Sequence, residues 1–363
     1  MHRPCKKFIA STLATVLFVY CSAQAASPPA PHLIVLQYHH VSSSTPASTS
    51  LTPARFEAHL QWLEDNAFTV VDLPTALDTL RSGGTLPDKT AAISFDDGYY
   101  DVYEAAFPIL RDRQLPFTIF INPEPHDAGR RGWASWDQLR EMAKSGGVIA
   151  NHTNTHLFMV RRTKDEAKSA WLERLEMEIT TAETRIKAET GQNHKILAYP
   201  FGESDRDIRQ LMENLGYMAF GQQSGSVYAG SNFTDLPRFP LSGIYSGMSS
   251  FSTKMLSLPM NVDSITPASR SQDNTLYYDE KAPALTLQLA NKSQLVLNCF
   301  ASGQDAISVD YEGEGTYRVQ ADEPLSSGRS RYNCTHSSDW TGRFHWFSYA
   351  WIKRDEQEQW SHQ

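Results

Sequence analysis

Short apolar runs alternate with longer amphipathic stretches from Pro31 to about Leu258. The runs are rich in Val, Ile and Phe, and this alternation is typical of βα units that build a mainly parallel sheet. We therefore expect a barrel-like α/β architecture over residues 31–260. The expected strands are Leu33–His39, Ala91–Phe95, Phe117–Ile121, Gly147–Ala150, Lys195–Tyr199 and Tyr217–Gly221.

The clearest predicted helix runs from about Lys164 to Glu189, and Gly191 follows its end. Its apolar positions recur at intervals of three and four while the opposite face is charged, so this helix should pack on the outside of the sheet. Similar apolar faces predict helices over Val102–Leu110 and Ile208–Leu215.

The pattern changes from about Thr266, where short or alternating apolar runs are separated by turns rich in Gly, Asn and Ser. This pattern predicts a small all-β, sandwich-like domain over residues 274–363, joined to the α/β part by a Ser- and Pro-containing linker over residues 261–273. The expected strands are Leu285–Leu289, Leu295–Leu297, Ile307–Val309 and Tyr317–Val319.

The first residues have the pattern of an export signal. Basic residues precede an apolar run from Phe8 to Tyr20, which gives way to the small residues Ala23 and Ala25. A membrane anchor or a buried core helix is the alternative, but the run is shorter than the roughly 20 residues that a membrane span needs. Lipidation at Cys21 is a third alternative, disfavoured by the bulky residues Phe18–Tyr20 before it. We expect a signal peptide over residues 1–25, no membrane span in the mature chain, and a periplasmic, cell-surface or extracellular location.

Charge and cysteine content narrow the functional classes. The 363-residue chain has a net charge of −8, and removal of residues 1–25 takes it to −11 because three Lys/Arg and no Asp/Glu are lost. Such an acidic protein is a poor partner for nucleic acid. In the mature chain only Cys299 and Cys334 remain, and in an oxidising compartment we expect a disulfide between them, two free buried thiols being the alternative.

Two sequence segments place metal-binding side chains at predicted strand ends. Asp96 and Asp97 follow an apolar strand and precede Gly98, and His152 and His156 follow another. Active sites of α/β barrels gather at the carboxyl ends of the strands. Asp97 and the two histidines would supply one oxygen and two nitrogens, which is the donor set of a catalytic divalent site with open positions. The alternatives are an ordinary Asp-Asp-Gly turn and a chance pair of surface histidines.

A third strand end, Ala198 to Gly202, contains a Pro-Phe-Gly turn that could offer a backbone N–H to an oxyanion. In order along the chain, Ser94–Gly98, His152–His156 and this turn resemble the motifs of the polysaccharide deacetylase family. The resemblance covers about residues 31–258. It implies a distorted (β/α) barrel and metal-dependent removal of N-acetyl groups from an N-acetylglucosamine polysaccharide.

Carried over position by position, the resemblance implies a role for each motif residue. Asp96 would be the catalytic base, and Phe201 would lend its N–H to the tetrahedral intermediate. The metal would be bound by Asp97, His152 and His156, with zinc expected and cobalt, nickel or iron as alternatives. Thr153 would steady the histidine loop.

Two departures from the family pattern concern the base and the acid. Ala198 stands where the family usually has an arginine that orients the base, so this role is either lost or supplied from elsewhere in the chain, for instance by Arg238. No histidine follows Leu241, where the family's catalytic acid usually lies. However, the segment from Tyr38 to Val41 resembles the opening motif of the poly-β-1,6-N-acetylglucosamine deacetylases, which implies His39 as the acid and His40 as the second choice. The alternative is that both histidines only cap a core strand.

Aromatic residues beside these motifs have two interpretations. Tyr99, Tyr100, Trp133 and Trp136 could stack on sugar rings or pack in the core. The aromatic segment Phe344–Ile352 could bind sugar, but we expect it to pack on the α/β domain.

Several functions remain open from the sequence. Poly-β-1,6-N-acetylglucosamine is the expected substrate, and chitin oligomers or peptidoglycan are the alternatives. An inactive carbohydrate-binding relative would keep the fold without the reaction. A metal-free glycoside hydrolase is disfavoured because the adjacent Asp96 and Asp97 cannot flank a glycosidic bond at the roughly 5 Å or greater separation that this reaction needs.

Overall fold

The computed structural model describes residues 29–357 and 359. The predicted signal peptide, residues 1–25, lies outside the described residues. Among the residues described, no helix has the length and apolar character needed to cross a membrane.

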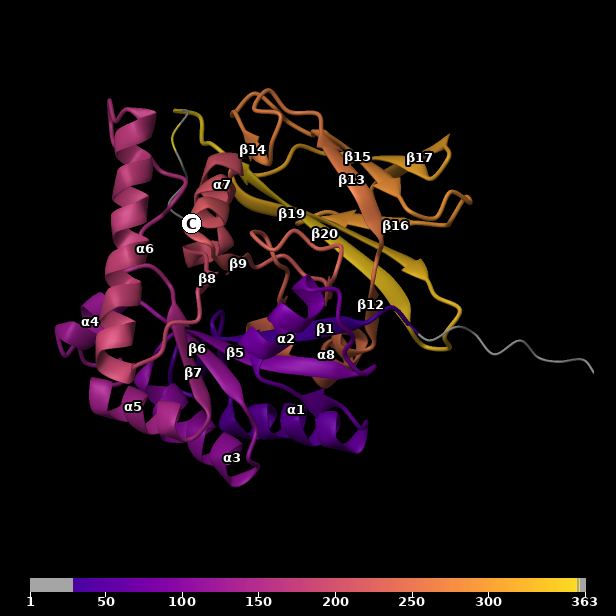
Figure 1. The fold of residues 1–363 in the computed structure, drawn as a ribbon. Helices are drawn as coiled ribbons and strands as arrows, with labels where there is room; N and C mark the ends of the chain where they lie inside the picture. Colours follow the sequence, from indigo (N-terminus) through magenta and orange to yellow (C-terminus); the bar gives the residue numbers. More distant parts are fainter. Residues whose placement is uncertain (1–28, 358, 360–363) are drawn as a thin grey trace, which may run out of the picture.

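A nine-stranded sheet forms the framework of the first part (Figure 1). Its strands pair in parallel, except that β10 runs antiparallel to β1. In spatial order the strands are β10 (Val227–Tyr228), β1 (His32–Tyr38), β5 (Thr90–Asp97), β6 (Phe117–Ile121), β7 (Gly147–Asn151), β8 (Ile196–Ala198) and β9 (Met218–Phe220), with β4 (Thr69–Val70) beside β5 and β11 (Phe239–Pro240) beside β1. A separate pair consists of β2 (His40–Val41) and β3 (Ser50–Leu51).

Both faces of the sheet are buried, which is why its strands read as continuous apolar runs. In β1, Leu33 and Val35 belong to one apolar cluster, whereas Ile34 and Leu36 belong to another that includes residues of α1, α3, α5 and α8. The helices are α1 (Pro53–Asp65), α2 (Leu73–Arg81), α3 (Phe107–Asp112), α4 (Pro123–Asp127), α5 (Trp136–Lys144), α6 (Lys168–Thr190), α7 (Arg206–Leu215) and α8 (Met248–Met255).

The long helix expected from about Lys164 is α6, which begins at Lys168 and ends at Gly191 in the left-handed conformation. Its apolar face packs on β8 and α7 through Leu175 and Ile179. Shorter helical turns are η1 (Val102–Ala106), η2 (Pro200–Gly202) and η3 (Gly243–Ser246). The helix expected over Val102–Leu110 is therefore a π-helical turn continued by α3.

The C-terminal part consists of two sheets that enclose a separate apolar core. One sheet contains β12 (Ser257–Pro259), β20 (Phe344–Lys353), β19 (Gly328–Ser337) and β16 (Asn298–Ala301), with β14 (Thr275–Leu276) beside β20. The other contains β13 (Val262–Pro267), β15 (Ala284–Leu289), β18 (Thr316–Gln320) and β17 (Ser308–Gly313). The expected disulfide is present, because Cys299 and Cys334 lie opposite each other on β16 and β19 and are bonded.

Two details differ from the sequence expectation. Residues 262–267, placed in the expected linker, instead form β13, which pairs with β15. Leu295–Leu297 lies outside the strands, and the strand begins at Asn298. β13 lies at the edge of its sheet and its side chains are half-buried or exposed, so its sequence lacks the apolar alternation of a strand with one buried face.

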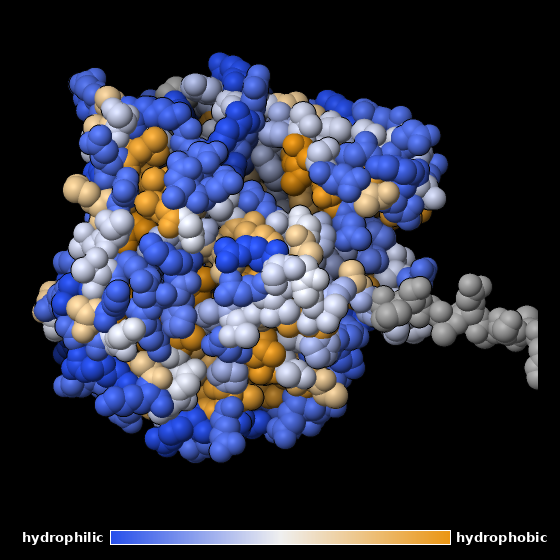
Figure 2. All heavy atoms as spheres, in the orientation of Figure 1, coloured by the Kyte–Doolittle hydropathy of each residue, from blue (hydrophilic) through white to orange (hydrophobic). Residues whose placement is uncertain are grey.

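The aromatic strand β20 packs against the α/β part, as expected. The ring of Trp346 lies 5.5 Å from that of Phe239, and Ile352 joins the cluster of α6 and α7. Arg343, just before β20, forms an ion pair with Asp88 at 2.7 Å. The face seen in Figure 2 is mostly hydrophilic, with hydrophobic side chains in smaller patches. The prediction of a distorted α/β barrel followed by all-β sheets is confirmed.

Candidate active site

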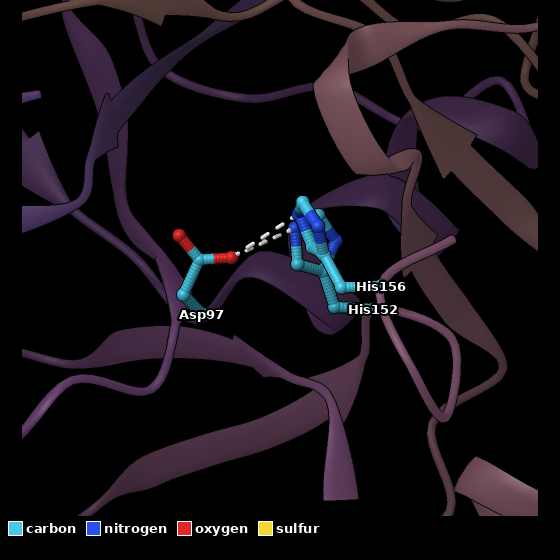
Figure 3. A group of neighbouring side chains, drawn as sticks. All are labelled: Asp97, His152 and His156. Carbon is cyan, nitrogen blue, oxygen red and sulfur yellow. Dashed lines mark ion pairs between the residues drawn. The ribbon is translucent and has the colours of Figure 1, made fainter. Parts of the chain in front are cut away.

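Asp97, His152 and His156 come together at the carboxyl ends of β5 and β7. Asp97 Oδ1 lies 3.4 Å from His152 Nε2 and 3.3 Å from His156 Nε2. Figure 3 shows the carboxylate facing both imidazole rings. One ligand atom from each residue lies within 4.8 Å of the other two. The structure therefore places the three predicted metal ligands around one point.

Backbone geometry at the end of β5 aims Asp97 into the site. Asp97 and Gly98 have φ angles of 73° and 70°. A Cβ atom on Gly98 would lie 2.8 Å from Ile121 and 2.9 Å from the ring of His126, so only glycine fits this close approach. The turn after Asp97 thus requires glycine at position 98.

Hydrogen bonds fix the histidine loop. His152 Nδ1 lies 2.7 Å from the carbonyl oxygen of Ala198, which leaves Nε2 directed at Asp97. This arrangement fits a metal ligand, because a backbone contact to one ring nitrogen sets the tautomer and orientation of the other. The backbone N–H of Thr153 donates to Asn151 Oδ1 at 2.9 Å, so Thr153 contributes to the loop through its main chain. Glu178 on α6 accepts two further backbone N–H bonds of this loop.

The protonation states of the three residues fit a divalent cation. Burial raises the pKa of Asp97, but its hydrogen bond to His152 and the nearby histidine charges outweigh this effect, so the net shift is downward and the carboxylate is ionised. Burial and the charge of His152 lower the pKa of His156 to about 4, which leaves a neutral ring. Burial opposes the charge of His152, yet contact with Asp97 and Asp96 raises its pKa. A bound cation would take the place of that proton.

Asp96 lies beside this cluster and is fully buried. Arg238, which is also fully buried, binds it through two contacts, Nη1 to Oδ1 at 2.6 Å and Nη2 to Oδ2 at 2.8 Å. Gln37 Nε2 donates to Oδ2 at 2.7 Å. Burial alone would raise the pKa of Asp96, but the charge of Arg238 and the hydrogen bonds lower it. The carboxylate therefore stays ionised, and Arg238 contacts both of its oxygens.

The two neighbouring histidines after β1 point to different partners. His39 Nε2 lies 3.8 Å from Asp96 Oδ2, and its side chain is 19% exposed. His40 Nδ1 lies 2.7 Å from Asp101 Oδ2, and its ring stacks on Tyr99 at 3.7 Å. His39 thus faces Asp96 from the edge of the site, whereas His40 is engaged with Asp101.

Phe201 sits at the turn after β8, next to the histidine loop. Its φ angle of 60° is unusual for a residue with a side chain. Its ring is stacked on Phe158 at 3.8 Å and lies 4.6 Å from the ring of His156. The predicted oxyanion turn is therefore adjacent to the three candidate ligands.

Aromatic side chains border the site near Asp97. Tyr99 is partly buried and packs on Trp133, with ring centroids 5.4 Å apart. Trp136 begins α5 and donates to Asp127, so it belongs to the helix packing rather than to the site. Tyr100 is 39% exposed.

Two functional contacts were missed in the sequence. Gln37 is a polar residue inside the apolar run of β1, the strand paired with β5, and this interruption was the signal. Glu178 lies on the charged face of α6, and no local pattern distinguishes it from its solvent-facing neighbours.

Comparison with known proteins agrees with this geometry. Residues 83–220 match the polysaccharide deacetylase family. The Bacillus subtilis (strain 168) protein YxkH, which is named as a polysaccharide deacetylase, is 29% identical over 185 residues, 51% of this chain and 62% of its own length. Poly-beta-1,6-N-acetyl-D-glucosamine N-deacetylase of Escherichia coli (strain K12) is 23% identical over 292 residues, 66% of this chain and 43% of its own.

The fold is also similar to solved structures. The structure of IcaB from Ammonifex degensii superposes with a TM-score of 0.55 at 22% identity, covering 62% of this chain and 98% of that one. The chain spans less than two thirds of the length of the two curated relatives named above. Residues 83–220 therefore form a polysaccharide deacetylase domain, and the surrounding sheet has the fold of solved polysaccharide deacetylases.

Proposed function

We propose that this protein is a metal-dependent N-deacetylase that acts on an N-acetylglucosamine polysaccharide. The observation that carries the proposal is the convergence of two sets of residues at one sheet edge. Asp97, His152 and His156 offer three ligand atoms within 4.8 Å of one another. Beside them, Asp96 is held ionised by Arg238. A carbohydrate-binding relative without activity would have no need of both sets.

Asp97, His152 and His156 would hold a divalent cation. Zinc is the metal we propose, and cobalt, nickel and iron suit the same two-nitrogen, one-oxygen donor set. When bound, such a cation polarises a carbonyl oxygen and lowers the pKa of a coordinated water.

Asp96 acts as the general base in this proposal. Its ionised carboxylate accepts a proton from the attacking water, and the two contacts to Arg238 hold it in one orientation. Gln37 donates to the same oxygen that faces His39, which limits the rotation of the carboxylate further. Positioned acid–base groups of this kind contribute roughly 10²–10⁴-fold to a rate.

His39 and Phe201 complete the set. Protonated His39 donates to the leaving amine nitrogen as the C–N bond breaks, because an amine leaves poorly without that proton. The Phe201 N–H donates to the developing oxyanion. His39 Nε2 is 3.8 Å from Asp96 Oδ2 and lies at the exposed side of the site, where a sugar amide can approach.

The substrate proposal rests on two observations. The E. coli relative is named for poly-beta-1,6-N-acetyl-D-glucosamine, and the Tyr38–Val41 segment resembles the opening motif of that branch. We therefore propose this polymer, with export to the periplasm or cell surface. Chitin oligomers and peptidoglycan are the alternatives.

Acetate release from β-1,6- and β-1,4-linked N-acetylglucosamine oligomers tests the function. The purified protein is assayed with chelator and then with added Zn²⁺. Release that requires the metal and is faster on the β-1,6 oligomer supports the proposal. Faster release from the β-1,4 oligomer would identify a β-1,4-linked polymer as the substrate instead. Zinc binding without any acetate release would favour a carbohydrate-binding role.

A further inference from the structure

The C-terminal sheet contributes a side chain to the edge of the candidate active site. Arg329 lies on β19, and its Nη1 donates to the carbonyl oxygen of Phe201 at 2.7 Å. The two residues are 128 positions apart in the sequence. This contact therefore exists only when the C-terminal sheet is packed on the barrel.

Arg329 contacts a turn in which Phe201 adopts an unfavourable backbone conformation. Phe201 has φ 60° and ψ 1°, a region that residues with a side chain seldom occupy. The next peptide is held at both ends, because the Gly202 N–H donates to Tyr199 O at 2.8 Å and the Phe201 carbonyl accepts from Arg329. Removing one of these bonds frees the peptide plane to rotate.

Other contacts hold Arg329 and Phe201 in place. Glu203, only 4% exposed, has Oε1 3.8 Å from Arg329 Nε. The guanidinium of Arg329 lies 5.7 Å from the centroid of the Phe201 ring. The Phe201 ring also stacks on Phe158, and the guanidinium of Arg161 lies 3.3 Å from the centroid of the Phe158 ring. The turn is thus in contact with Arg329 of the C-terminal sheet and, through Phe158, with Arg161 of the α/β part.

We propose that Arg329 is a positioning residue for deacetylation, supplied by the C-terminal sheet to fix the turn that presents the Phe201 N–H. This inference rests on the proposed function. A donor to an oxyanion acts through its pre-set position, and loss of one such donor costs roughly 10²–10³-fold in kcat. Misplacement of about 1 Å by a distant substitution can cost roughly 10²-fold.

The test compares Arg329→Gln, Arg329→Lys and Arg331→Gln with the wild type. Arg331 is the matched control, because it lies two residues further on the same face of β19, and Gln removes the same charge there. Each variant is assayed for kcat and KM of acetate release. Zinc content, the thermal unfolding midpoint and the Kd of methylphosphonate, a tetrahedral anion, are measured on the zinc-loaded protein.

Arg329→Gln should lower kcat by about 10- to 100-fold with KM changed by less than about twofold. The reason is that Arg329 positions the Phe201 N–H, which stabilises an oxyanion that exists only in the transition state and the tetrahedral intermediate. It should weaken methylphosphonate binding by about 10-fold at unchanged zinc content. Arg329→Lys, which keeps the positive charge on a single donor nitrogen without the planar guanidinium, should fall between. Arg331→Gln should match the wild type.

Equal losses in Arg329→Gln and Arg331→Gln would overturn the inference, since a general charge effect would explain both. A change in KM alone would also overturn it, as would wild-type kcat and methylphosphonate affinity in Arg329→Gln. Methylphosphonate binding is independent of turnover, so it still decides the inference when no oligomer is deacetylated by the wild type. Absence of wild-type release would instead count against the proposed function.

Discussion

Arg238 and Asp96 form a fully buried, two-contact ion pair although they are 142 positions apart in the sequence. Arg238 also donates to the carbonyl oxygen of Gly221, which fixes the guanidinium between β5 and the segment after β9. Under the proposed function, Arg238, which lies just before β11, would take the role of the arginine that the family usually has at the position of Ala198. Two parallel donors hold the carboxylate in one plane as well as in one protonation state.

Replacement of Arg238 by Met should move the acid limb of the kcat/KM profile to higher pH. The pKa of Asp96 is lowered by Arg238 against the opposing effect of burial, so removal of the arginine raises it. A carboxyl next to an arginine is typically lowered by about 1–3 units, and a shift of at least about one unit is expected. The profile of acetate release against pH measures it. Arg209→Met, which breaks the partly buried pair with Asp273 outside the site, is the control and should leave the acid limb in place.

The same pair predicts a non-additive effect on stability. Arg238→Met leaves a buried carboxylate without its partner, which should cost about 3–5 kcal/mol in the free energy of unfolding. The double variant Asp96→Asn/Arg238→Met removes that charge and should recover part of the loss. Denaturant unfolding of both single variants and the double variant checks this. Simple addition of the two single effects would show that the residues are not coupled.

His39→Ala should slow amide hydrolysis much more than ester hydrolysis. An amine leaves only after protonation, whereas a phenolate leaves without it, so 4-nitrophenyl acetate should be spared. The expected loss of kcat for the oligomer is roughly 10²–10⁴-fold. His40→Ala, whose ring contacts Asp101 rather than Asp96, is the control. Equal losses on amide and ester would argue against His39 as the acid.

Substitution of a candidate ligand should weaken metal binding directly. His156→Ala removes one of the three converging ligand atoms. Loss of a residue that only supports a ligand typically weakens metal binding by about 10–100-fold. Loss of the ligand itself should weaken Zn²⁺ binding by more than this, measured by titration calorimetry. His336→Ala on the C-terminal sheet is a matched control and should bind Zn²⁺ like the wild type. Unchanged affinity of His156→Ala would place the metal elsewhere.

Glu203 predicts a pH-dependent stability difference. Burial raises its pKa from 4.5 to about 7 in the folded chain. Between about pH 4.5 and pH 7 the folded state retains a proton that the unfolded state has lost, so the stability contributed by this group is lost as pH rises. As pH rises through this window, the unfolding free energy of Glu203→Gln should increase relative to that of the wild type by up to about 3 kcal/mol. A constant difference from pH 4 to pH 8 would show that Glu203 ionises normally.

The sequence predicted the features that are local. The strand ending at Asp96, Asp97 and Gly98 combines apolar periodicity with a turn that needs glycine, so its position and its side chains could be anticipated together. The pairing of Cys299 with Cys334 followed from their being the only cysteines outside the predicted signal peptide. The family resemblance predicted His152 and His156 as metal ligands, and the fold brings them together with Asp97.

Features that depend on packing between distant segments were harder to predict. Arg238 was one candidate replacement for the arginine missing at the position of Ala198, and nothing in the sequence around it indicated two contacts with Asp96. The contact between Arg329 and Phe201 joins the two parts of the chain, and no local pattern marks it. Strand β13 was assigned to a linker because an edge strand with exposed side chains lacks the apolar alternation that identifies a strand.

The most direct test of the account compares the wild type with Asp96→Asn, both loaded with Zn²⁺, in acetate release from the β-1,6-linked oligomer. We predict that the variant binds Zn²⁺ like the wild type, since Asp96 lies outside the ligand set, and releases acetate at least about 10²-fold more slowly. A variant that holds Zn²⁺ and keeps the wild-type rate would contradict the assignment of Asp96 as the base and, with it, the central claim.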